Sequence, residues 1–253
     1  MLEQYLKNRA ATRDILLMTH VVMGYPSFEA SLEIVESMVE AGVDLMELQI
    51  PFSEPVADGP VILHANQRAL EAGATVERCM KFAEQVTRRF EIPFLFMSYY
   101  NILYQHGVSR FMQRSRELGI AGAIVPDLPP EEGVEYLRAA EQSGVSPVFI
   151  FTPNTTRERL EYLGKHARGL VYCVARRGVT GSDTEFSREL GDYLERCRKA
   201  TSLPLAVGFG VKTREDVEFL KGKAEIAVIG SQTIRLVEER GVSAVGGFIR
   251  SLR

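Results

Sequence analysis

The sequence contains no tryptophan, only three cysteines and no apolar run long enough to cross a membrane. A membrane-spanning helix needs about 20 consecutive, mostly apolar residues, so that class of protein is excluded. Cys79, Cys173 and Cys197 are widely spaced and odd in number, which argues against a disulfide framework or a zinc site. The polar N-terminal segment also lacks the apolar core of a signal peptide. We therefore expect reduced thiols in a cytoplasmic protein.

A strong excess of either charge is absent as well. The chain of 253 residues has 30 Lys and Arg side chains and 33 Asp and Glu side chains, for a formal net charge of −3. This balance gives no indication of a nucleic-acid or anionic-membrane partner. The hydrophobic share of 45% is enough for a large core. The length is close to the roughly 250 residues typical of one (β/α)8 barrel, although length alone would also allow two domains.

Eight short apolar runs alternate with amphipathic stretches along the whole chain. Their nearly continuous apolar character is typical of parallel strands that are buried on both faces. No linker or low-complexity stretch interrupts the series, so we predict one domain over residues 1–253. The predicted strands are Leu16–Met23, Leu45–Ile50, Phe94–Ser98, Gly122–Pro126, Pro147–Phe151, Gly169–Val174, Pro204–Gly208 and Ile226–Gly230.

This alternation fits either a closed barrel or an open doubly wound sheet. The open sheet would need a glycine-rich fingerprint after its first strand, and residues 20–26 do not supply one. We therefore predict an α/β protein with a (β/α)8 TIM barrel and an extra N-terminal helix. Active sites of such barrels lie at the C-terminal ends of the strands, where we expect the functional residues.

Local signals predict the starts of several helices. Thr213 with Asp216, and Thr155 with Glu158, each have the spacing of a capping box. Residues 129–132, Pro-Pro-Glu-Glu, favour the first turn of another helix. Proline is tolerated in a first turn, and acidic side chains interact favourably with the positive end of a helix.

The end of the second predicted strand combines Glu47 and Gln49 with apolar neighbours. Side chains alternate along a strand, so Glu47 and Gln49 share one face, and Leu48 and Ile50 share the other. The apolar pair suits the layer between strands and helices, which leaves the polar pair facing the barrel interior. Burial raises the pKa of a carboxyl group toward the range useful for general acid–base catalysis. The alternative is a structural glutamate bonded to backbone groups of the loop.

Glycines and a small polar residue follow the last two predicted strands, in Gly208-Phe209-Gly210 and Gly230-Ser231. This is the usual phosphate corner of a barrel, where backbone N–H groups and a helix N-terminus bind a dianion. The loop after the sixth strand, residues 175–184, contains glycines, hydroxyl groups and two arginines. It suits a lid over a phosphorylated substrate, and an ordinary surface loop is the alternative.

Other catalytic devices of barrel enzymes are missing. None of the seven lysines falls within a predicted strand, which argues against a Schiff-base aldolase. The four histidines show no shared metal-binding spacing, so we expect no metal and no cofactor. His20, at the end of the first strand, is either a pocket-lining or a satisfied core histidine. The reaction classes that remain are carbon–carbon bond cleavage and isomerisation, each catalysed by carboxylates.

The segment from Glu47 to Pro60, Glu-Leu-Gln-Ile-Pro-Phe-Ser-Glu-Pro-Val-Ala-Asp-Gly-Pro, resembles the signature of the tryptophan synthase α subunit family. Further motifs similar to those of the family follow in order over nearly the whole chain. They are Ser98–Asn101, Val125–Glu132, Arg176–Gly181, Gly208–Gly210 and Ile229–Ser231.

The resemblance implies a lyase that cleaves indole-3-glycerol phosphate into indole and glyceraldehyde 3-phosphate without a cofactor and passes the indole to a β subunit. It assigns general acid–base catalysis to Glu47. It implies that Asp58 accepts a hydrogen bond from the indole N–H group and stabilises the positive charge that develops on the ring. The substrate contacts that it implies are Tyr99, Tyr172, Thr180, Gly181, Phe209, Gly210, Gly230 and Ser231.

Four residues depart from the usual pattern of the family. Gln49 replaces a glycine, His20 stands where an aromatic residue is usual, Val22 replaces a threonine, and Arg177 replaces a small residue. We expect His20 and Gln49 to make the indole pocket smaller or more polar, and the Gln49 amide either to donate to Glu47 or to contact the ligand. Two alternatives stay open: a related barrel enzyme with another phosphorylated substrate, and a non-catalytic regulatory subunit of a β partner. The presence of both carboxylates argues against the second.

Overall fold

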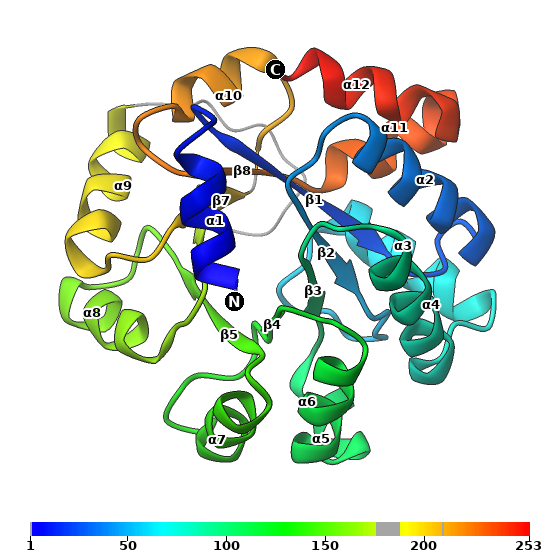
Figure 1. The fold of residues 1–253 in the computed structure, drawn as a ribbon, viewed down its shortest axis with the longest axis horizontal. Coiled ribbons are helices and arrows are strands. Elements are labelled where there is room, and N and C mark those ends of the chain that lie inside the picture. The colour runs from blue at the N-terminus through cyan, green and yellow to red at the C-terminus, as the bar shows by residue number, and fades with distance from the viewer. Residues whose placement is uncertain (1, 176–187, 209) are drawn as a thin grey trace.

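The computed structural model describes residues 2–175, 188–208 and 210–253. Eight parallel strands form a closed barrel in sequence order, and β1 pairs with β8 to complete it (Figure 1). The prediction of a (β/α)8 TIM barrel is therefore confirmed. The strands are β1 (Leu16–Val22), β2 (Leu45–Gln49), β3 (Phe94–Met97), β4 (Gly122–Ile124), β5 (Ser146–Phe151), β6 (Val171–Val174), β7 (Leu205–Gly208) and β8 (Ile226–Ile229).

Helices surround the strands in a ring (Figure 1). Two helices follow β2 and two follow β3, in place of the single helix of a simple βα unit. The described helices are α1 (Leu2–Ala10), α2 (Phe28–Glu40), α3 (Pro60–Glu71), α4 (Val76–Arg89), α5 (Tyr100–His106), α6 (Val108–Glu117), α7 (Val134–Ser143), α8 (Arg157–His166), α9 (Arg188–Ala200), α10 (Arg214–Leu220), α11 (Ser231–Arg240), the 3-10 helix η1 (Val242–Ala244) and α12 (Val245–Ser251).

The predicted N-terminal helix, α1, closes one end of the barrel. Its buried Leu2 and Leu6 side chains pack in one cluster with barrel-interior residues such as Leu16, Leu45 and Leu95. In Figure 1 this helix crosses the barrel opening on the viewer's side. Because the N-terminal end is filled, the C-terminal ends of the strands form the end that is open to a ligand.

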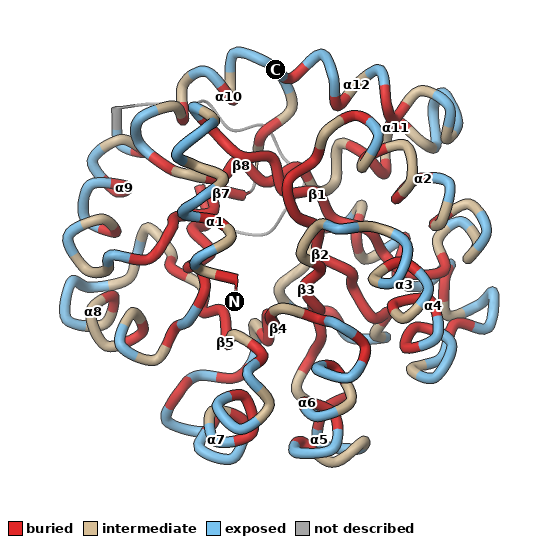
Figure 2. Tube along the Cα trace, viewed as in Figure 1, coloured by how far each residue is buried: buried red, intermediate tan, exposed pale blue. Residues whose placement is uncertain are grey.

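Side chains alternate along each strand between two hydrophobic clusters. In β2, Met46 and Leu48 pack in the layer between strands and helices, whereas Leu45 belongs to the interior cluster. The same alternation turns Glu47 and Gln49 inward. Figure 2 shows the buried residues concentrated along the strands and the exposed residues on the outer faces of the helices.

The two predicted capping boxes differ in outcome. Thr213 and Asp216 form the predicted box at the start of α10, with both reciprocal hydrogen bonds present. The second prediction is wrong by one residue, because Thr156 and not Thr155 caps α8. The Thr155 hydroxyl group bonds instead within the turn that precedes the helix.

Helix α7 begins later than its prolines suggest. Residues 130–132 form a turn, and the helix starts at Val134. Glu131 in that turn forms an ion pair with Arg159 of α8. The predicted helix start at residues 129–132 is therefore wrong. The Glu131 carboxylate pairs with Arg159 of α8 and does not interact with the N-terminus of α7.

A buried carboxylate, Asp44, ties segments near both ends of the chain to the start of β2. It is 0% exposed and accepts hydrogen bonds from the Leu17 backbone N–H and from Arg9 Nε, both at 3.0 Å. Nη2 of Arg253 lies at 2.8 Å and Nη1 of Arg13 at 3.2 Å from the carboxylate. This network lies at the N-terminal end of the strands, away from the open end of the barrel.

Among the described helices, none is both long and apolar enough to cross a membrane. The part of the chain that the structure describes also holds no group of three or more His, Cys, Asp or Glu side chains placed to bind a metal ion. The three cysteines are buried free thiols.

Candidate active site

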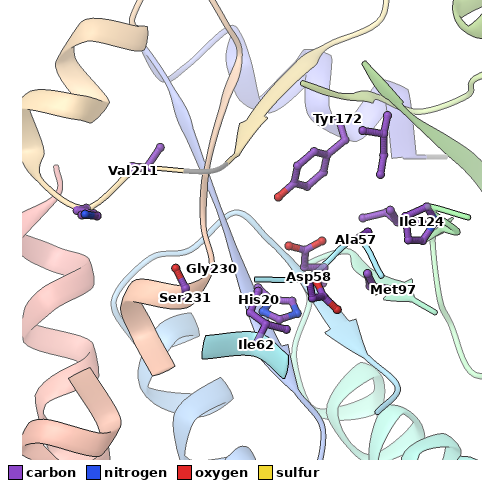
Figure 3. A pocket seen from close by; sticks show the side chains of 15 residues that line it. His20, Ala57, Asp58, Ile62, Met97, Ile124, Tyr172, Val211, Gly230 and Ser231 are labelled. Atoms are coloured by element: carbon purple, nitrogen blue, oxygen red, sulfur yellow. The ribbon is translucent and has the colours of Figure 1, made fainter. Parts of the chain in front are cut away.

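A cavity lies at the C-terminal ends of the strands, with walls supplied by strand ends and the loops that follow them (Figure 3). Two predicted site residues, Gln49 and Tyr99, are buried and bond to one of its wall residues, Asp58. The cavity itself brings together seven residues singled out in the sequence: His20, Glu47, Asp58, Tyr172, Gly210, Gly230 and Ser231. The other predicted residues lie outside the described residues: Arg176, Arg177, Thr180, Gly181 and Phe209.

Glu47 reaches the cavity from β2 and is buried. Burial raises the pKa of its carboxyl group to about 8, and the nearby charge of Asp58 adds to the rise. No hydrogen bond from another described residue reaches the Glu47 carboxyl oxygens. The structural alternative, a glutamate bonded to backbone groups of the loop, therefore finds no support among the described residues. A neutral carboxylic acid that lines a cavity can donate its proton to a ligand.

Asp58 lies in the loop between β2 and α3 and lines the same cavity. Its Oδ2 atom accepts hydrogen bonds from Gln49 Nε2 at 2.7 Å and from the Tyr99 hydroxyl group at 3.0 Å. Burial raises the pKa of Asp58 to about 6, and the two donors limit the rise because they stabilise the charged form. At neutral pH, Asp58 is therefore ionised while Glu47 keeps its proton.

Tyr99 holds the loop that presents Asp58. Its hydroxyl group donates to Asp58 and accepts a hydrogen bond from the Ala57 backbone N–H at 3.1 Å. Its ring stacks on Phe52 with 5.2 Å between the ring centroids. Tyr99 thus contacts the loop at three positions and acts behind the cavity wall.

Gln49 lies between His20 and Asp58. Its amide oxygen is 2.7 Å from His20 Nε2, and its amide nitrogen is 2.7 Å from Asp58 Oδ2. Burial lowers the pKa of His20 to about 4, so this cavity-lining ring is neutral. Of the two alternatives for the Gln49 amide, donation to Glu47 is wrong, because the loop brings the Asp58 carboxylate within reach of the amide, and contact with the ligand stays a prediction.

Tyr172 enters the cavity from β6, and its hydroxyl group points toward the side where Asp58 lies (Figure 3). Gly208 of β7 makes room for it. A Cβ atom at this glycine would lie 2.3 Å from the Tyr172 hydroxyl oxygen and 2.7 Å from two ring carbons. The sequence pattern places Gly208 in a phosphate motif, whereas the structure shows that it accommodates the tyrosine ring.

Gly230 and Ser231 lie next to each other on another side of the cavity (Figure 3), and Gly210 also lines it; these three residues are called the phosphate corner below. Gly230 is the N-cap of α11 and Ser231 its first residue. Backbone N–H groups in a first helical turn lack intrahelical partners and, with the positive end of the helix, attract anions. Gly210 has a φ of 128°, which strongly favours glycine. The corner has the composition of a phosphate site.

The sequence motifs do not identify all residues of the cavity. Lys212, half-buried two residues after Gly210, places a cationic side chain among the residues of the same wall. The available signal in the sequence was a basic residue two positions after the glycine motif. The apolar wall has no sequence signal, because a strand residue that faces a cavity has the same pattern as one in the core. Its members include Ile62, Met97, Ile124 and Ile150.

Comparison with known proteins gives one family. Residues 6–247 match the family model described as tryptophan synthase alpha chain. The tryptophan synthase alpha chain of Desulforapulum autotrophicum is 63% identical over 252 residues, and that of Syntrophotalea carbinolica is 60% identical over 253 residues. Both matches cover 100% of this chain and 100% of the relative.

Solved structures agree. A chain of Mycobacterium tuberculosis tryptophan synthase matches with a TM-score of 0.93 at 28% identity, covering 99% of this chain and 96% of that one. A chain of the tryptophan synthase complex from Pyrococcus furiosus matches with a TM-score of 0.86 at 30% identity, covering 94% and 97%. With its closed barrel and its family motifs, the chain belongs to the tryptophan synthase alpha chain family.

Proposed function

We propose that this chain cleaves indole-3-glycerol phosphate to indole and glyceraldehyde 3-phosphate, the lyase reaction of its family, with Glu47 and Asp58 as the catalytic pair. One observation carries the proposal. Two carboxyl groups line one cavity with separated pKa values, about 8 for Glu47 and about 6 for Asp58. Such a separation is expected where one group acts as an acid and the other as a fixed negative charge.

Glu47 starts the reaction by donating its proton to the indole carbon that bears the glycerol phosphate chain. The ring then carries a positive charge, which the Asp58 carboxylate stabilises while accepting a hydrogen bond from the indole N–H group. The Glu47 carboxylate next removes the proton of the adjacent hydroxyl group. The carbon–carbon bond breaks, its electron pair returns to the ring, and the hydroxyl carbon becomes the aldehyde carbon. Glu47 ends protonated, so the cycle closes without a cofactor.

Positioning of the substrate contributes the rest of the rate. General acid–base catalysis supplies about 10²–10⁴-fold, so orientation and electrostatic stabilisation must supply the remainder. The phosphate group is proposed to bind at the corner of Gly210, Gly230 and Ser231, and the indole ring to lie between the apolar wall and Tyr172. Further contacts proposed on the resemblance alone are Thr180, Gly181 and Phe209.

The indole product is proposed to pass to a tryptophan synthase β subunit. Two large apolar side chains support a protein partner at this end of the barrel. Val56, in the loop that holds Asp58, is 74% exposed, and Tyr104 of α5 is 65% exposed. Both segments follow the C-terminal ends of neighbouring strands, and exposed apolar side chains beside a site are typical of protein interfaces.

Two further assignments extend the proposal. We place the chain in the cytoplasm, a location supported by its three free cysteines, since secreted proteins commonly pair theirs. We also treat residues 1–253 as one domain. Pairing of β1 with β8, from opposite ends of the chain, supports this assignment because the barrel needs both.

Indole release from indole-3-glycerol phosphate by the purified chain, with and without a β subunit, tests the proposal. Glu47→Gln should lower kcat by about 100-fold or more while phosphate-ligand binding stays near wild type. Asp58→Asn should lower kcat less, because an amide oxygen still accepts the indole N–H bond. Glu54→Gln changes an exposed glutamate of the same loop and should keep wild-type kcat.

Two outcomes would overturn these assignments. If Glu47→Gln kept more than about a tenth of the wild-type kcat, Glu47 would not be the acid–base group. Full activity in Asp58→Asn would remove Asp58 from the mechanism.

A further inference from the structure

Gln49 connects the first strand of the barrel to the catalytic loop. In the register of β1 and β2, Gln49 pairs with Val22, and His20 pairs with Glu47. The Gln49 Oε1 atom lies 2.7 Å from His20 Nε2, and its Nε2 atom lies 2.7 Å from Asp58 Oδ2. The Gln49 side chain is 0% exposed and His20 is 4% exposed, so the bridge is shielded from bulk solvent.

The chemistry of the three groups fixes the direction of both hydrogen bonds. An ionised Asp58 carboxylate only accepts, so the Gln49 amide nitrogen must face it and the amide oxygen must face His20. His20 must then carry its proton on Nε2 and donate it to that oxygen. Burial lowers the pKa of His20 to about 4, so the ring is neutral and its Nδ1 atom holds no proton at neutral pH. Both donors in the bridge therefore point toward Asp58.

The bridge makes the Asp58 carboxylate asymmetric. Gln49 and Tyr99 both donate to Oδ2, whereas no described residue donates to Oδ1. We propose that His20 and Gln49 are a positioning pair, which holds Asp58 Oδ2 against the barrel wall and leaves Oδ1 to accept the N–H group of an indole ring. The inference rests on the proposed function and deepens it. The pair acts on the substrate through Asp58, and so selects for a ring with a correctly placed N–H donor.

Other ionisable groups surround Asp58 and set the background for its titration. Among the described residues, only Gln49 and the Tyr99 hydroxyl group donate hydrogen bonds to the Asp58 carboxylate. Loss of the Gln49 amide therefore removes one of two side-chain hydrogen bonds that favour the charged carboxylate. The groups facing Asp58 are Glu47 from β2, His20 from β1, Tyr99 ahead of α5, Tyr172 from β6 and, on the other side of the cavity, Lys212.

The pH dependence of kcat/KM for indole-3-glycerol phosphate tests the pair. Gln49→Met nearly keeps the side-chain volume and removes both hydrogen bonds of the bridge, together with the longer bond of 3.5 Å from Gln49 Nε2 to Asn66 Oδ1. We expect kcat/KM at neutral pH to fall about tenfold. The acidic limb of the profile should move to higher pH by about one unit, because a hydrogen bond to a charged group is lost. Gln113→Met, at an exposed glutamine of α6, is the matched control and should leave the limb in place.

A second variant tests the His20 half of the bridge. His20→Phe removes the donor that orients the amide, so it should move the acidic limb in the same direction by less. In the Gln49→Met background, His20→Phe should cause no additional shift of the acidic limb, because the effects of two residues that act through the same hydrogen bonds are not additive. Additive effects of the two substitutions would contradict a shared role.

A purely structural role for Gln49 would change the free energy of unfolding without moving the limb, so urea unfolding is measured on every variant. Gln49→Glu keeps the shape and covers the case in which Gln49→Met fails to fold. Its ionisation next to Asp58 should bring a loss of activity at a lower pH than the alkaline loss of the wild type. If the kcat/KM profiles of Gln49→Met and Gln49→Glu had their acidic and alkaline limbs at the wild-type pH, the positioning role would be overturned and the proposed function would be unaffected. Absence of indole release by the wild type, with and without a β subunit, would instead overturn the proposed function itself.

Discussion

Gly208 and Tyr172 lie on neighbouring strands and share one space, because a Cβ atom at position 208 would lie 2.3 Å from the Tyr172 hydroxyl oxygen. Two ring carbons would be 2.7 Å away, so the whole ring lies against the glycine. The missing side chain at position 208 therefore decides where the Tyr172 hydroxyl group stands in the cavity.

Gly208→Ala should push the Tyr172 ring into the cavity and lower kcat/KM by about tenfold, since overpacking forces side chains out of their rotamers. Steady-state kinetics measure the effect. Gly247→Ala is the control, because a Cβ atom at that exposed helical glycine meets no atom within 4 Å. Wild-type kcat/KM in Gly208→Ala would show that the position of the Tyr172 ring is unimportant for the substrate.

The phosphate corner should hold an anion in a crystal grown with phosphate or sulfate, beside the N–H groups of Gly210, Gly230 and Ser231. Lys212→Met should raise KM for indole-3-glycerol phosphate several-fold and change kcat less, because it removes a cation that lines the cavity together with the proposed phosphate corner. Lys81→Met, at an exposed lysine of α4, should leave both constants unchanged. An anion bound consistently elsewhere, with this corner empty, would contradict the assignment.

Asp44→Asn should lower the free energy of unfolding by about 3 kcal/mol, because it removes the charge that Arg9, Arg13 and Arg253 share. Activity should stay near wild type, since the network lies at the end of the barrel opposite the cavity. Asp14→Asn provides the comparison, at an 85% exposed carboxylate 3.9 Å from Lys221. Asp14→Asn should change the free energy of unfolding by less than about 0.5 kcal/mol. Equal changes for the two variants would contradict a stabilising role of the Asp44 network.

The free energy of unfolding should depend on pH because the pKa of Glu47 is raised in the folded protein. From about pH 4.5 to about pH 8 the unfolded chain releases this proton while the folded chain keeps it, so the free energy of unfolding falls as pH rises. Glu47→Gln lacks the titrating group. The stability of this variant relative to the wild type should therefore increase across that window, by at most about 1.4 kcal/mol per pH unit. Urea unfolding at several pH values measures the slope, and a difference independent of pH would exclude a raised Glu47 pKa.

The architecture follows from the sequence because strand formation depends on short apolar runs with clear boundaries. All eight predicted strands are present, with ends that shift by one or two residues. The first residue of a helix is harder to predict, because neighbouring side chains compete to cap the same helix end. Thr213 caps as predicted, whereas Thr155 turns back on its own loop and leaves the cap to the adjacent Thr156.

The site is only partly predictable from sequence because its contacts cross between elements. Alternation along β2 places Gln49 on the inner face, but its partners come from β1 and from a loop nine residues later. No local sequence pattern predicts that the loop after β2 folds back and brings Asp58 to Gln49 at the end of the strand. The role of Gly208 likewise depends on the Tyr172 ring of a neighbouring strand, which a glycine motif does not reveal.

The opposite protonation states of Glu47 and Asp58 are the central claim, and the pH profile of kcat/KM in wild type and Asp58→Asn tests it most directly. The wild type should show a bell, with an acidic limb near the Asp58 pKa of about 6 and an alkaline limb near the Glu47 pKa of about 8. A phosphate ester also titrates near about pH 6, so the alkaline limb is the decisive one. In Asp58→Asn this limb should move to lower pH, because the charge that helps Glu47 to keep its proton is gone. Activity that rises through pH 8, or an alkaline limb that Asp58→Asn does not move, would contradict the account.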